Sequence, residues 1–247
     1  MAAATGQDAS TWANKVLREM LIHGGRRRGF RLCHCAVLGT EHSGLLISGP
    51  TAVGKTDLAL KLAKRLYVNV VTVDRGVIGH RHGGLAVGTL PFGLNIHRDT
   101  LADLGCLNEA LVHRYRLSNN KHYLDVLDAQ RHCRITLVAW APVTAAVELR
   151  RASSTTQWQR LDHASVIRTI RGADSADTDP GYQVDWLGMG SHQASRPLHA
   201  TEVATGWALA YRPDQPIPDA WVEEVAAALD TPRRNNGRSQ SQQKGSS

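Results

Sequence analysis

The sequence contains no apolar run that approaches the ~18 residues needed for a membrane-spanning helix. Aromatic residues make up 5% of its 247 residues, and the first ten residues are small and polar, without the apolar centre of a signal peptide. Hydrophobic residues (42%) and charged residues (21%) are near the averages of globular proteins. These features exclude a helical membrane protein, a collagen-like repeat and pervasive disorder. They predict a cytoplasmic protein with no membrane partner.

Cysteine is also scarce, with four residues in the whole chain: Cys33, Cys35, Cys106 and Cys133. The spacing of Cys33 and Cys35 is tighter than the two-residue spacing of common zinc ligands, and no second closely spaced pair accompanies it. Buried, reduced thiols are therefore expected.

The net charge of +7 is gathered near the two ends of the chain. The contributing residues are Arg26, Arg27, Arg28, Arg31, Arg233, Arg234, Arg238 and Lys244. The remainder is nearly neutral, so the basic pI says little about the ligand of the core. The basic segments are either solvated or in contact with a polyanion such as a nucleic acid.

One segment carries a recognisable phosphate-binding pattern. An apolar run at 45–48 ends in glycine, and Leu58, Leu62 and Leu66 recur every four residues after it, which predicts a strand, a loop and an amphipathic helix. Between the expected strand and helix, the sequence has the pattern Gly, four residues, Gly-Lys-Thr. The residues expected to bind phosphate are Gly49, Pro50, Thr51, Ala52, Val53, Gly54, Lys55 and Thr56.

The residue types of this loop suit a phosphate or a diphosphate. Glycines let the backbone turn its N–H groups toward an anion, and the start of the following helix adds partial positive charge. Lys55 is expected to contact terminal phosphate oxygens, and the Thr56 hydroxyl to ligate Mg²⁺. Asp74 follows the next apolar run, at 68–73, so a parallel sheet would place its carboxylate beside the loop as a proton acceptor or metal ligand.

The apolar spacing along the whole chain predicts an α/β fold, with a P-loop parallel sheet flanked by helices and a helical C-terminal portion. Strands are expected at 30–38, 45–48, 68–73, 122–127 and 135–140. Helices are expected at 11–22, directly after the loop, and at 101–116, 143–151, 153–170, 202–211 and 219–229, with loops at 76–92 and 173–197. Composition divides the chain into an N-terminal lead-in (1–43), the P-loop domain (44–230) and a disordered basic tail (231–247).

The segment 49–63, GPTAVGKTDLALKLA, resembles the start of the isopentenyltransferases, a family that includes tRNA dimethylallyltransferases and bacterial adenylate dimethylallyltransferases of cytokinin synthesis. Further similar segments are VVTVDR at 70–75, GTLP at 88–91 and HYLDVLD at 122–128. The similarity is strongest over 45–91 and weaker as far as Leu149.

This resemblance implies a Mg²⁺-dependent transferase that moves a dimethylallyl group from dimethylallyl diphosphate to the N6 amine of adenine, in a nucleotide or a tRNA. Lys55 and Thr56 would then hold the diphosphate with Mg²⁺, Thr51 would bind the bridging oxygen of the donor, and Asp74 would accept the amine proton. Two positions depart from the family pattern: Val77 stands where the family has a glutamine, and residues 140–142 (WAP) replace a Gly-Gly-Thr element.

Two other functions fit the same residues. A P-loop kinase, using a nucleoside triphosphate, would employ Arg150, Arg151 and Arg160 as a clamp on phosphoryl oxygens. The segment 32–37 before the loop resembles kinases of the HPr type, in which His34 would be a site residue rather than a core histidine, although Val73 replaces the first aspartate of their Asp-Asp-Arg segment. A nucleotide-binding protein without catalytic activity is the third interpretation.

Overall fold

The structure is a computed structural model. It describes residues 16–17, 20–21, 23–25, 27–90, 94–107, 121–174 and 198–230. The expected tail at 231–247, most of the expected helix at 11–22, the expected loop at 173–197 and Pro91 lie mostly or wholly outside these residues.

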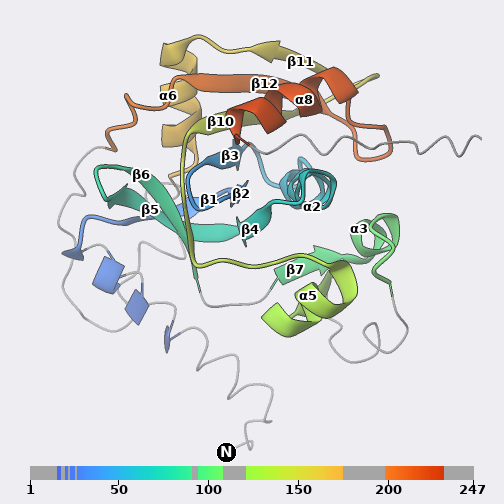
Figure 1. The fold of residues 1–247 in the computed structure, drawn as a ribbon, viewed down its shortest axis with the longest axis horizontal. Helices are drawn as coiled ribbons and strands as arrows, with labels where there is room; N and C mark the ends of the chain where they lie inside the picture. Colours follow the sequence, from blue (N-terminus) through green and yellow to red (C-terminus); the bar gives the residue numbers. More distant parts are fainter. Residues whose placement is uncertain are drawn as a thin grey trace, which may run out of the picture.

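A mixed six-stranded sheet forms the centre of the molecule (Figure 1), with the strand order β11-β12-β10-β3-β2-β4. Its strands are β2 (Ala36–Gly39), β3 (Gly44–Ser48), β4 (Asn69–Thr72), β10 (Ala145–Arg151), β11 (Gln157–Arg160) and β12 (Thr205–Tyr211). β3, β10 and β12 run parallel, whereas β2 is antiparallel to both β3 and β4, and β11 is antiparallel to β12. A parallel sheet was expected, and this expectation is wrong for β2 and β11, which run antiparallel to their neighbours.

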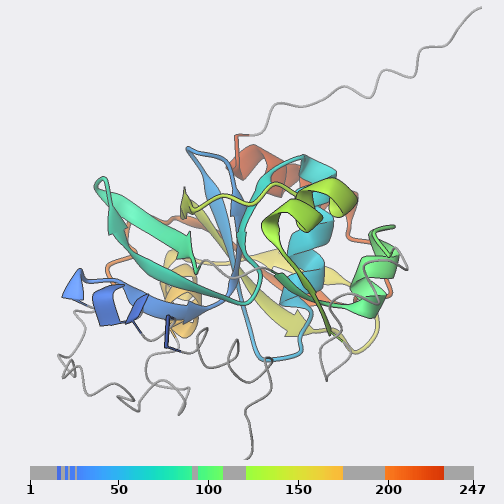
Figure 2. The same ribbon diagram turned by 90° about the horizontal axis from the view of Figure 1, so that it is seen from below.

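Two smaller sheets accompany the central one. The first has the order β1-β5-β6-β9 and is antiparallel throughout. Its strands are β1 (Arg31–His34), β5 (Arg75–Arg81), β6 (Gly84–Thr89) and β9 (Trp140–Pro142). The second pairs β7 (Leu94–His97) with β8 (Lys121–Leu124). Figure 2 shows the β5–β6 hairpin on one side of the molecule and the helices α2 (Lys55–Leu66), α3 (Arg98–Asp103) and α5 (Val126–Cys133) on the other.

The described helices pack on both faces of the central sheet or against the β7–β8 pair. They are α2 (Lys55–Leu66), α3 (Arg98–Asp103), α5 (Val126–Cys133), α6 (His163–Gly172) and α8 (Asp219–Ala228). Strand residues alternate between two cores: Leu45 and Ile47 pack with α2 and α8, whereas Leu46 packs with α6 and the β5–β6 hairpin. Strands buried on both faces carry continuous apolar runs, which explains the composition of β3. Every described helix is too short or too polar to cross a membrane.

Two segments with helical composition are strands in the structure. The segment at 143–151 contains β10, and the segment at 202–211 contains β12, so the expected helical C-terminal portion is a strand followed by α8. Their alanines and leucines are good helix formers, but β10 lies between β3 and β12 and pairs with β12 along its whole length and with β3 over Ala145–Glu148. Tertiary pairing overrides local propensity here.

Three other expectations change in detail. The expected loop at 76–92 forms the β5–β6 hairpin, which turns at His82 and Gly83 with positive φ angles of 51° and 88°. The expected strand at 135–140 reduces to an isolated bridge between Leu137 and Val70, followed by the start of β9. The expected helix at 153–170 divides into β11 and α6, because the Asp162 side chain caps α6 by accepting a hydrogen bond from the Ser165 backbone.

The expected boundary between residues 43 and 44 falls inside the β2–β3 hairpin. β2 belongs to the lead-in by sequence, yet it lies between β3 and β4 in the six-stranded sheet. The last part of the lead-in, which contains β2, is thus continuous with the core.

Candidate functional site

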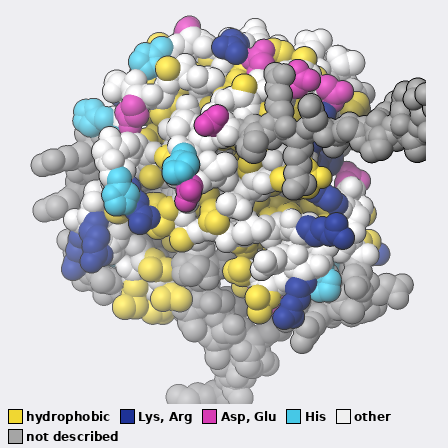
Figure 3. Space-filling view, in the orientation of Figure 1, with side chains coloured by type: hydrophobic (Ala, Val, Ile, Leu, Met, Phe, Trp, Pro, Cys, Tyr) yellow, Lys and Arg dark blue, Asp and Glu magenta, His cyan; other side chains and the backbone are white. Residues whose placement is uncertain are grey.

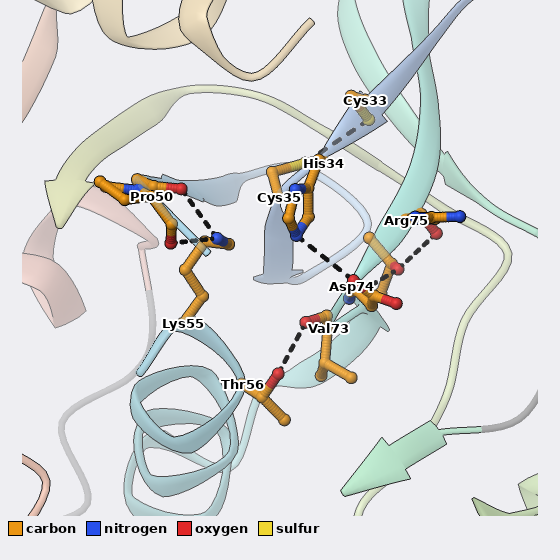
Figure 4. Close-up of polar contacts among 11 residues, drawn as sticks. Cys33, His34, Cys35, Pro50, Lys55, Thr56, Val73, Asp74 and Arg75 are labelled. Carbon is orange, nitrogen blue, oxygen red and sulfur yellow. Dashed lines mark hydrogen bonds and ion pairs between the residues drawn. The ribbon is translucent and has the colours of Figure 1, made fainter. Parts of the chain in front are cut away.

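Three chain segments meet at one edge of the central sheet. The phosphate loop leaves the carboxyl end of β3, and Asp74 follows the carboxyl end of β4. Since β2 runs antiparallel to both, its amino end lies at the same edge, with Ala36 opposite Ile47 and Val37 opposite Thr72. His34 precedes β2 and is thereby brought beside Asp74, as Figure 4 shows.

The phosphate loop is shaped by close packing at its two glycines. A Cβ at Gly49 would lie 2.4 Å from the Leu149 carbonyl oxygen, so a side chain has no room there. Gly54 has a φ of 101° and caps the start of α2, where its carbonyl accepts a hydrogen bond from the Leu58 N–H. Between them Pro50, Thr51 and Ala52 are exposed and Val53 is buried, which leaves the rim of the loop open to a ligand. Thr51 therefore lies on the exposed rim.

The Lys55 ammonium lies inside this loop. It is 6% exposed, and Nζ donates hydrogen bonds of 2.8 Å to the carbonyl oxygens of Gly49 and Pro50. Burial lowers the pKa of Lys55, and the negative charge of Asp74 acts in the opposite direction. Figure 4 shows the Lys55 ammonium beside Pro50, in the same region as the His34 and Asp74 side chains. Lys55 is thus a fixed donor at the position where terminal phosphate oxygens are expected.

Thr56 and Asp74 together fit a Mg²⁺ ion held mainly by phosphates. The Thr56 hydroxyl donates to the Val73 carbonyl at 2.9 Å, so its oxygen lone pairs are left for a metal. The Asp74 carboxylate follows directly after Val73 and is 46% exposed. Mg²⁺ commonly takes one or two protein oxygens and completes its shell with water and phosphate. In the described part of the chain, no three His, Cys, Asp or Glu side chains cluster as a metal site. The Thr56 hydroxyl and the Asp74 carboxylate would hold Mg²⁺ together with the oxygens of a phosphorylated ligand.

His34 holds Asp74 in place. His34 Nε2 lies 3.3 Å from Asp74 Oδ1, and the His34 side chain is 32% exposed, so it is not a core histidine. The hydrogen bond from His34 lowers the pKa of Asp74; burial acts against this shift, and the charges of Arg75 and Lys121 add to it. Asp74 is therefore an ionised carboxylate that contacts the His34 imidazole and is influenced by the charges of Arg75 and Lys121.

This shift predicts a pH-dependent contribution of Asp74 to stability. Because the pKa is lower in the folded state, the ionised carboxylate stabilises the fold above the unfolded pKa of about 4, and this contribution is lost as the pH falls through the folded pKa. The free energy of unfolding of the parent chain should exceed that of Asp74→Asn at pH 5, and the difference should shrink toward pH 3. Urea denaturation at each pH measures it, with the exposed Asp230→Asn as control. A difference that stays constant from pH 5 to pH 3 would contradict the assignment.

A cavity of about 540 Å³ opens beside the phosphate loop, at the carboxyl ends of β10 and β12. Its lining comprises Arg151, Ala152, Ser153, Tyr211, Arg212, Pro213 and Asp214. A Cβ at Gly54 would meet the Tyr211 ring at 3.2 Å and Pro213 at 3.5 Å, so the wall of this cavity touches the phosphate loop. Its volume is in the range of small-molecule sites.

A buried network supports the wall of this cavity. The Tyr211 hydroxyl donates a 2.5 Å hydrogen bond to Asp57 Oδ2, and Lys61 Nζ lies 3.0 Å from the same oxygen. Burial raises the pKa of Tyr211, so the phenol remains a donor. Asp57 and Tyr211 were not among the residues expected at the site. The sequence signal for Asp57 is an aspartate in the first turn of a helix whose buried face is otherwise mostly apolar.

The structure separates the three arginines expected to clamp a phosphate. Arg151 lines the cavity beside the loop, whereas Arg150 pairs with Glu148 and Arg160 pairs with Glu224 on the surface. Val77, at the position of the family glutamine, lies in β5 opposite Leu32 of β1, and its side chain packs against a small apolar cluster.

No protein-family model matches this sequence, and no curated protein matches it. Among solved structures, the HPr(Ser) kinase/phosphatase from Coxiella burnetii is similar, with a TM-score of 0.41 and 12% sequence identity over 81% of this chain and 88% of that chain. A likeness of this degree says nothing about the reaction of this chain.

Proposed function

We propose that this protein is a Mg²⁺-dependent phosphotransferase that moves the γ-phosphoryl group of a nucleoside triphosphate to a hydroxyl acceptor. The observation that carries the proposal is the charge around Asp74. The His34 imidazole lies 3.3 Å from this carboxylate, the charges of Arg75 and Lys121 lower its pKa, and the buried Lys55 lies at the same end of the sheet. Negative charge on transferring phosphoryl oxygens is stabilised by such a cationic setting.

The nucleotide would bind in two adjoining places. The loop at 49–56 presents backbone N–H groups and Lys55 to the phosphates, and the Arg151–Arg212 cavity touches the same loop through Tyr211. Arg151, Ser153 and Asp214 offer hydrogen bonds to a ribose or a base, while Tyr211 and Pro213 offer apolar contact. Thr56 would hold Mg²⁺ directly and Asp74 would face it through water, and the ion neutralises charge on the departing nucleoside diphosphate when bound.

Asp74 would orient the acceptor. Its Oδ1 is held by His34, and its exposed side is free to accept a hydrogen bond from the attacking hydroxyl. The acceptor oxygen bonds to the γ-phosphorus, the bond from that phosphorus to the bridging oxygen breaks, and the hydroxyl proton passes to Asp74. A weakly basic carboxylate suffices because the transition state is loose and the proton moves late. His34 is a positioning residue in this scheme.

Dimethylallyl transfer to adenine N6 is the competing outcome, since the same loop would hold its diphosphate. The prenyl carbon becomes positively charged as the diphosphate departs, and the charges of Arg75 and Lys121 beside the site would oppose that charge. The dimethylallyl group also makes no hydrogen bonds with the arginines beside the loop. These two points favour phosphoryl transfer.

The test measures both reactions on one preparation. Binding of Mg²⁺–ATP is followed by calorimetry, and γ-phosphoryl transfer is followed with labelled ATP and water, small hydroxyl compounds or HPr as acceptors. Dimethylallyl diphosphate is supplied in parallel with AMP or tRNA, and the products are analysed by mass spectrometry. We expect Mg²⁺–ATP binding and γ-phosphate turnover, with no prenylated adenine.

Variants connect the activity to the site. His34→Ala should lower turnover about 100-fold, a typical effect of losing a group that positions an acid or base, while Mg²⁺–ATP still binds. The control His42→Ala, at an exposed turn between β2 and β3, should retain full turnover. Prenylated adenine without phosphoryl transfer would overturn the proposal in favour of the isopentenyltransferase function. Binding of Mg²⁺–ATP without turnover on any acceptor would indicate a nucleotide-binding protein that is not an enzyme.

A further inference from the structure

One face of the four-stranded sheet β1-β5-β6-β9 carries two aromatic rings and an arginine. The rings of Phe30, just before β1, and Trp140, in β9, have centroids 5.2 Å apart. The guanidinium carbon of Arg81, the last residue of β5, lies 5.0 Å from the centroid of the Trp140 ring. These three side chains form one continuous surface, which we call the aromatic–basic face.

Two glycines of this sheet allow the rings to lie against the backbone. A Cβ at Gly79 would lie 2.4 Å from the Phe30 ring, and a Cβ at Gly88 would lie 2.6 Å from the Trp140 ring. Any larger residue at either position would therefore displace a ring. Both rings are partly exposed, and neither belongs to the apolar cores. The face thus presents its rings to solvent on a sheet that fixes their position.

The charge of the aromatic–basic face is positive. The strands β1, β5, β6 and β9 contain no aspartate or glutamate. Arg81 is exposed at the end of β5, and Arg28 is exposed shortly before β1. Among the described residues, no carboxylate forms an ion pair with either arginine. Figure 3 shows basic side chains next to hydrophobic ones at the left of the view, where Figure 1 has β5, β6 and the residues before β1. An anionic partner is therefore expected.

Two carboxylates do contact this sheet, but they pair with residues of its opposite face. Asp174 pairs with Arg31, and Glu202 Oε1 lies 3.6 Å from His80 Nε2. Arg31 and His80 are each adjacent in sequence to a residue of the aromatic–basic face. Since side chains alternate along a strand, both point away from that face. The carboxylates therefore leave the positive charge of the aromatic–basic face in place.

Aromatic rings beside arginines suit a partner that has both flat rings and negative charge. The bases of a nucleic acid stack on aromatic side chains and guanidinium planes, and its phosphates attract arginines. In a duplex the bases stack on one another, so that only a single strand can offer them to the protein. An apolar partner would leave the arginines without a contact, and an acidic peptide would leave the rings without one.

We propose that the aromatic–basic face binds single-stranded nucleic acid. Bases stack on Phe30 and on the Trp140–Arg81 pair, and phosphates lie beside Arg28 and Arg81. This inference does not rest on the proposed phosphotransferase activity, because none of these residues belongs to the candidate site. Binding requires neither ATP nor Mg²⁺, so the result of the phosphoryl-transfer test leaves this proposal unaffected.

The test uses the full chain without ATP or Mg²⁺. Fluorescence anisotropy measures the dissociation constants of a labelled oligouridylate, a labelled oligothymidylate and a duplex DNA of the same length. We expect the single strands to bind at least ~10-fold more tightly than the duplex, because only they can stack on the rings. Their affinity should fall as salt is added, because arginine–phosphate contacts release counterions.

Two variants of the aromatic–basic face separate stacking from charge. Trp140→Ala should weaken single-strand binding about 10-fold, the size of effect expected from the loss of one stacked base. Arg81→Gln should weaken it less and reduce the slope of the salt dependence by about 0.7. The matched controls are Trp158→Ala, a partly buried ring on β11, and Arg171→Gln, an exposed cation on α6. Both should bind like the parent chain.

A measurement on the parent chain locates the bound strand even if Trp140→Ala fails to fold. An oligonucleotide that contains 4-thiouridine is photocrosslinked to the protein, and crosslinked peptides are identified by mass spectrometry. We expect crosslinks in the peptides that contain Phe30 or Trp140. Crosslinks confined to the basic tail at 231–247, equal affinity for the duplex, or unchanged affinity in both variants would overturn the proposal. Absence of oligonucleotide binding would also overturn it, and self-association that Arg81→Gln abolishes would then assign the face to a second copy of the chain.

Discussion

Replacement of Lys55 by alanine should lower γ-phosphoryl turnover about 10² to 10³-fold, the usual loss when one fixed donor to developing negative charge is removed. Lys55 is 6% exposed, and hydrogen bonds to the carbonyl oxygens of Gly49 and Pro50 fix the position of its ammonium. A cation from solvent would not be held in this position. Its loss removes a positive charge from the place where phosphoryl oxygens are expected. The measurement is steady-state turnover of Mg²⁺–ATP.

The stability of the Lys55→Ala chain should change much less than its activity. The ammonium binds two carbonyls of an exposed loop, and water can reach the Pro50 carbonyl once the side chain is gone. Thermal unfolding should therefore remain close to that of the parent chain. Arg171→Ala, which removes an exposed cation in the last turn of α6, is the control and should leave turnover unchanged. Turnover within a factor of three of the parent would contradict a role of Lys55 in phosphate binding.

Replacement of Trp207 by alanine should reduce the free energy of unfolding by about 3–5 kcal/mol. Trp207 lies in β12 and is 0% exposed. Its ring meets the Trp221 ring edge-on, with centroids 6.4 Å apart, and its indole N–H donates to Glu224 Oε2 at 2.9 Å. The substitution would leave a cavity between β12 and α8 and remove one of the two hydrogen-bond partners, Trp207 and Arg160, of the Glu224 carboxylate. Urea denaturation followed by far-UV circular dichroism measures the loss.

Two further variants divide this effect into packing and hydrogen bonding. Trp207→Phe retains an aromatic ring but loses the N–H, so it should lose a smaller part of the free energy. Trp158→Ala, on the edge strand β11 where the side chain is only partly buried, should cost less than Trp207→Ala. An equal loss in Trp158→Ala and Trp207→Ala would show that the β12–α8 contact is not the main support of this region.

The region around the phosphate loop was predictable because its signals are local. Gly49 and Gly54 are required by close packing and a positive φ, and the leucines of α2 repeat at helical spacing within a few residues. The expected strand, loop, helix and strand are all present as β3, the loop, α2 and β4. Each depends on residues less than ten positions apart.

The segments at 143–151 and 202–211 were not predictable by the same reasoning. Their composition suits a helix, but β10 and β12 pair with each other across about sixty residues of sequence, with Val147 opposite Trp207. A strand in the middle of a sheet is decided by which neighbours it finds, and apolar runs buried on both faces lose the alternation that identifies a strand.

By itself the sequence determined that the chain has a glycine-bounded loop with Lys55 and Thr56 at the start of a helix, because glycine stereochemistry and helical spacing act over short distances. Only the tertiary structure decided that His34 pairs with Asp74, since this contact requires β2 to run antiparallel between β3 and β4. It also decided that Arg151 and Tyr211 meet beside the loop and that Phe30, Arg81 and Trp140 come together on one face of a sheet. Such contacts arise from the burial of whole elements against one another, and no short stretch of residues encodes them.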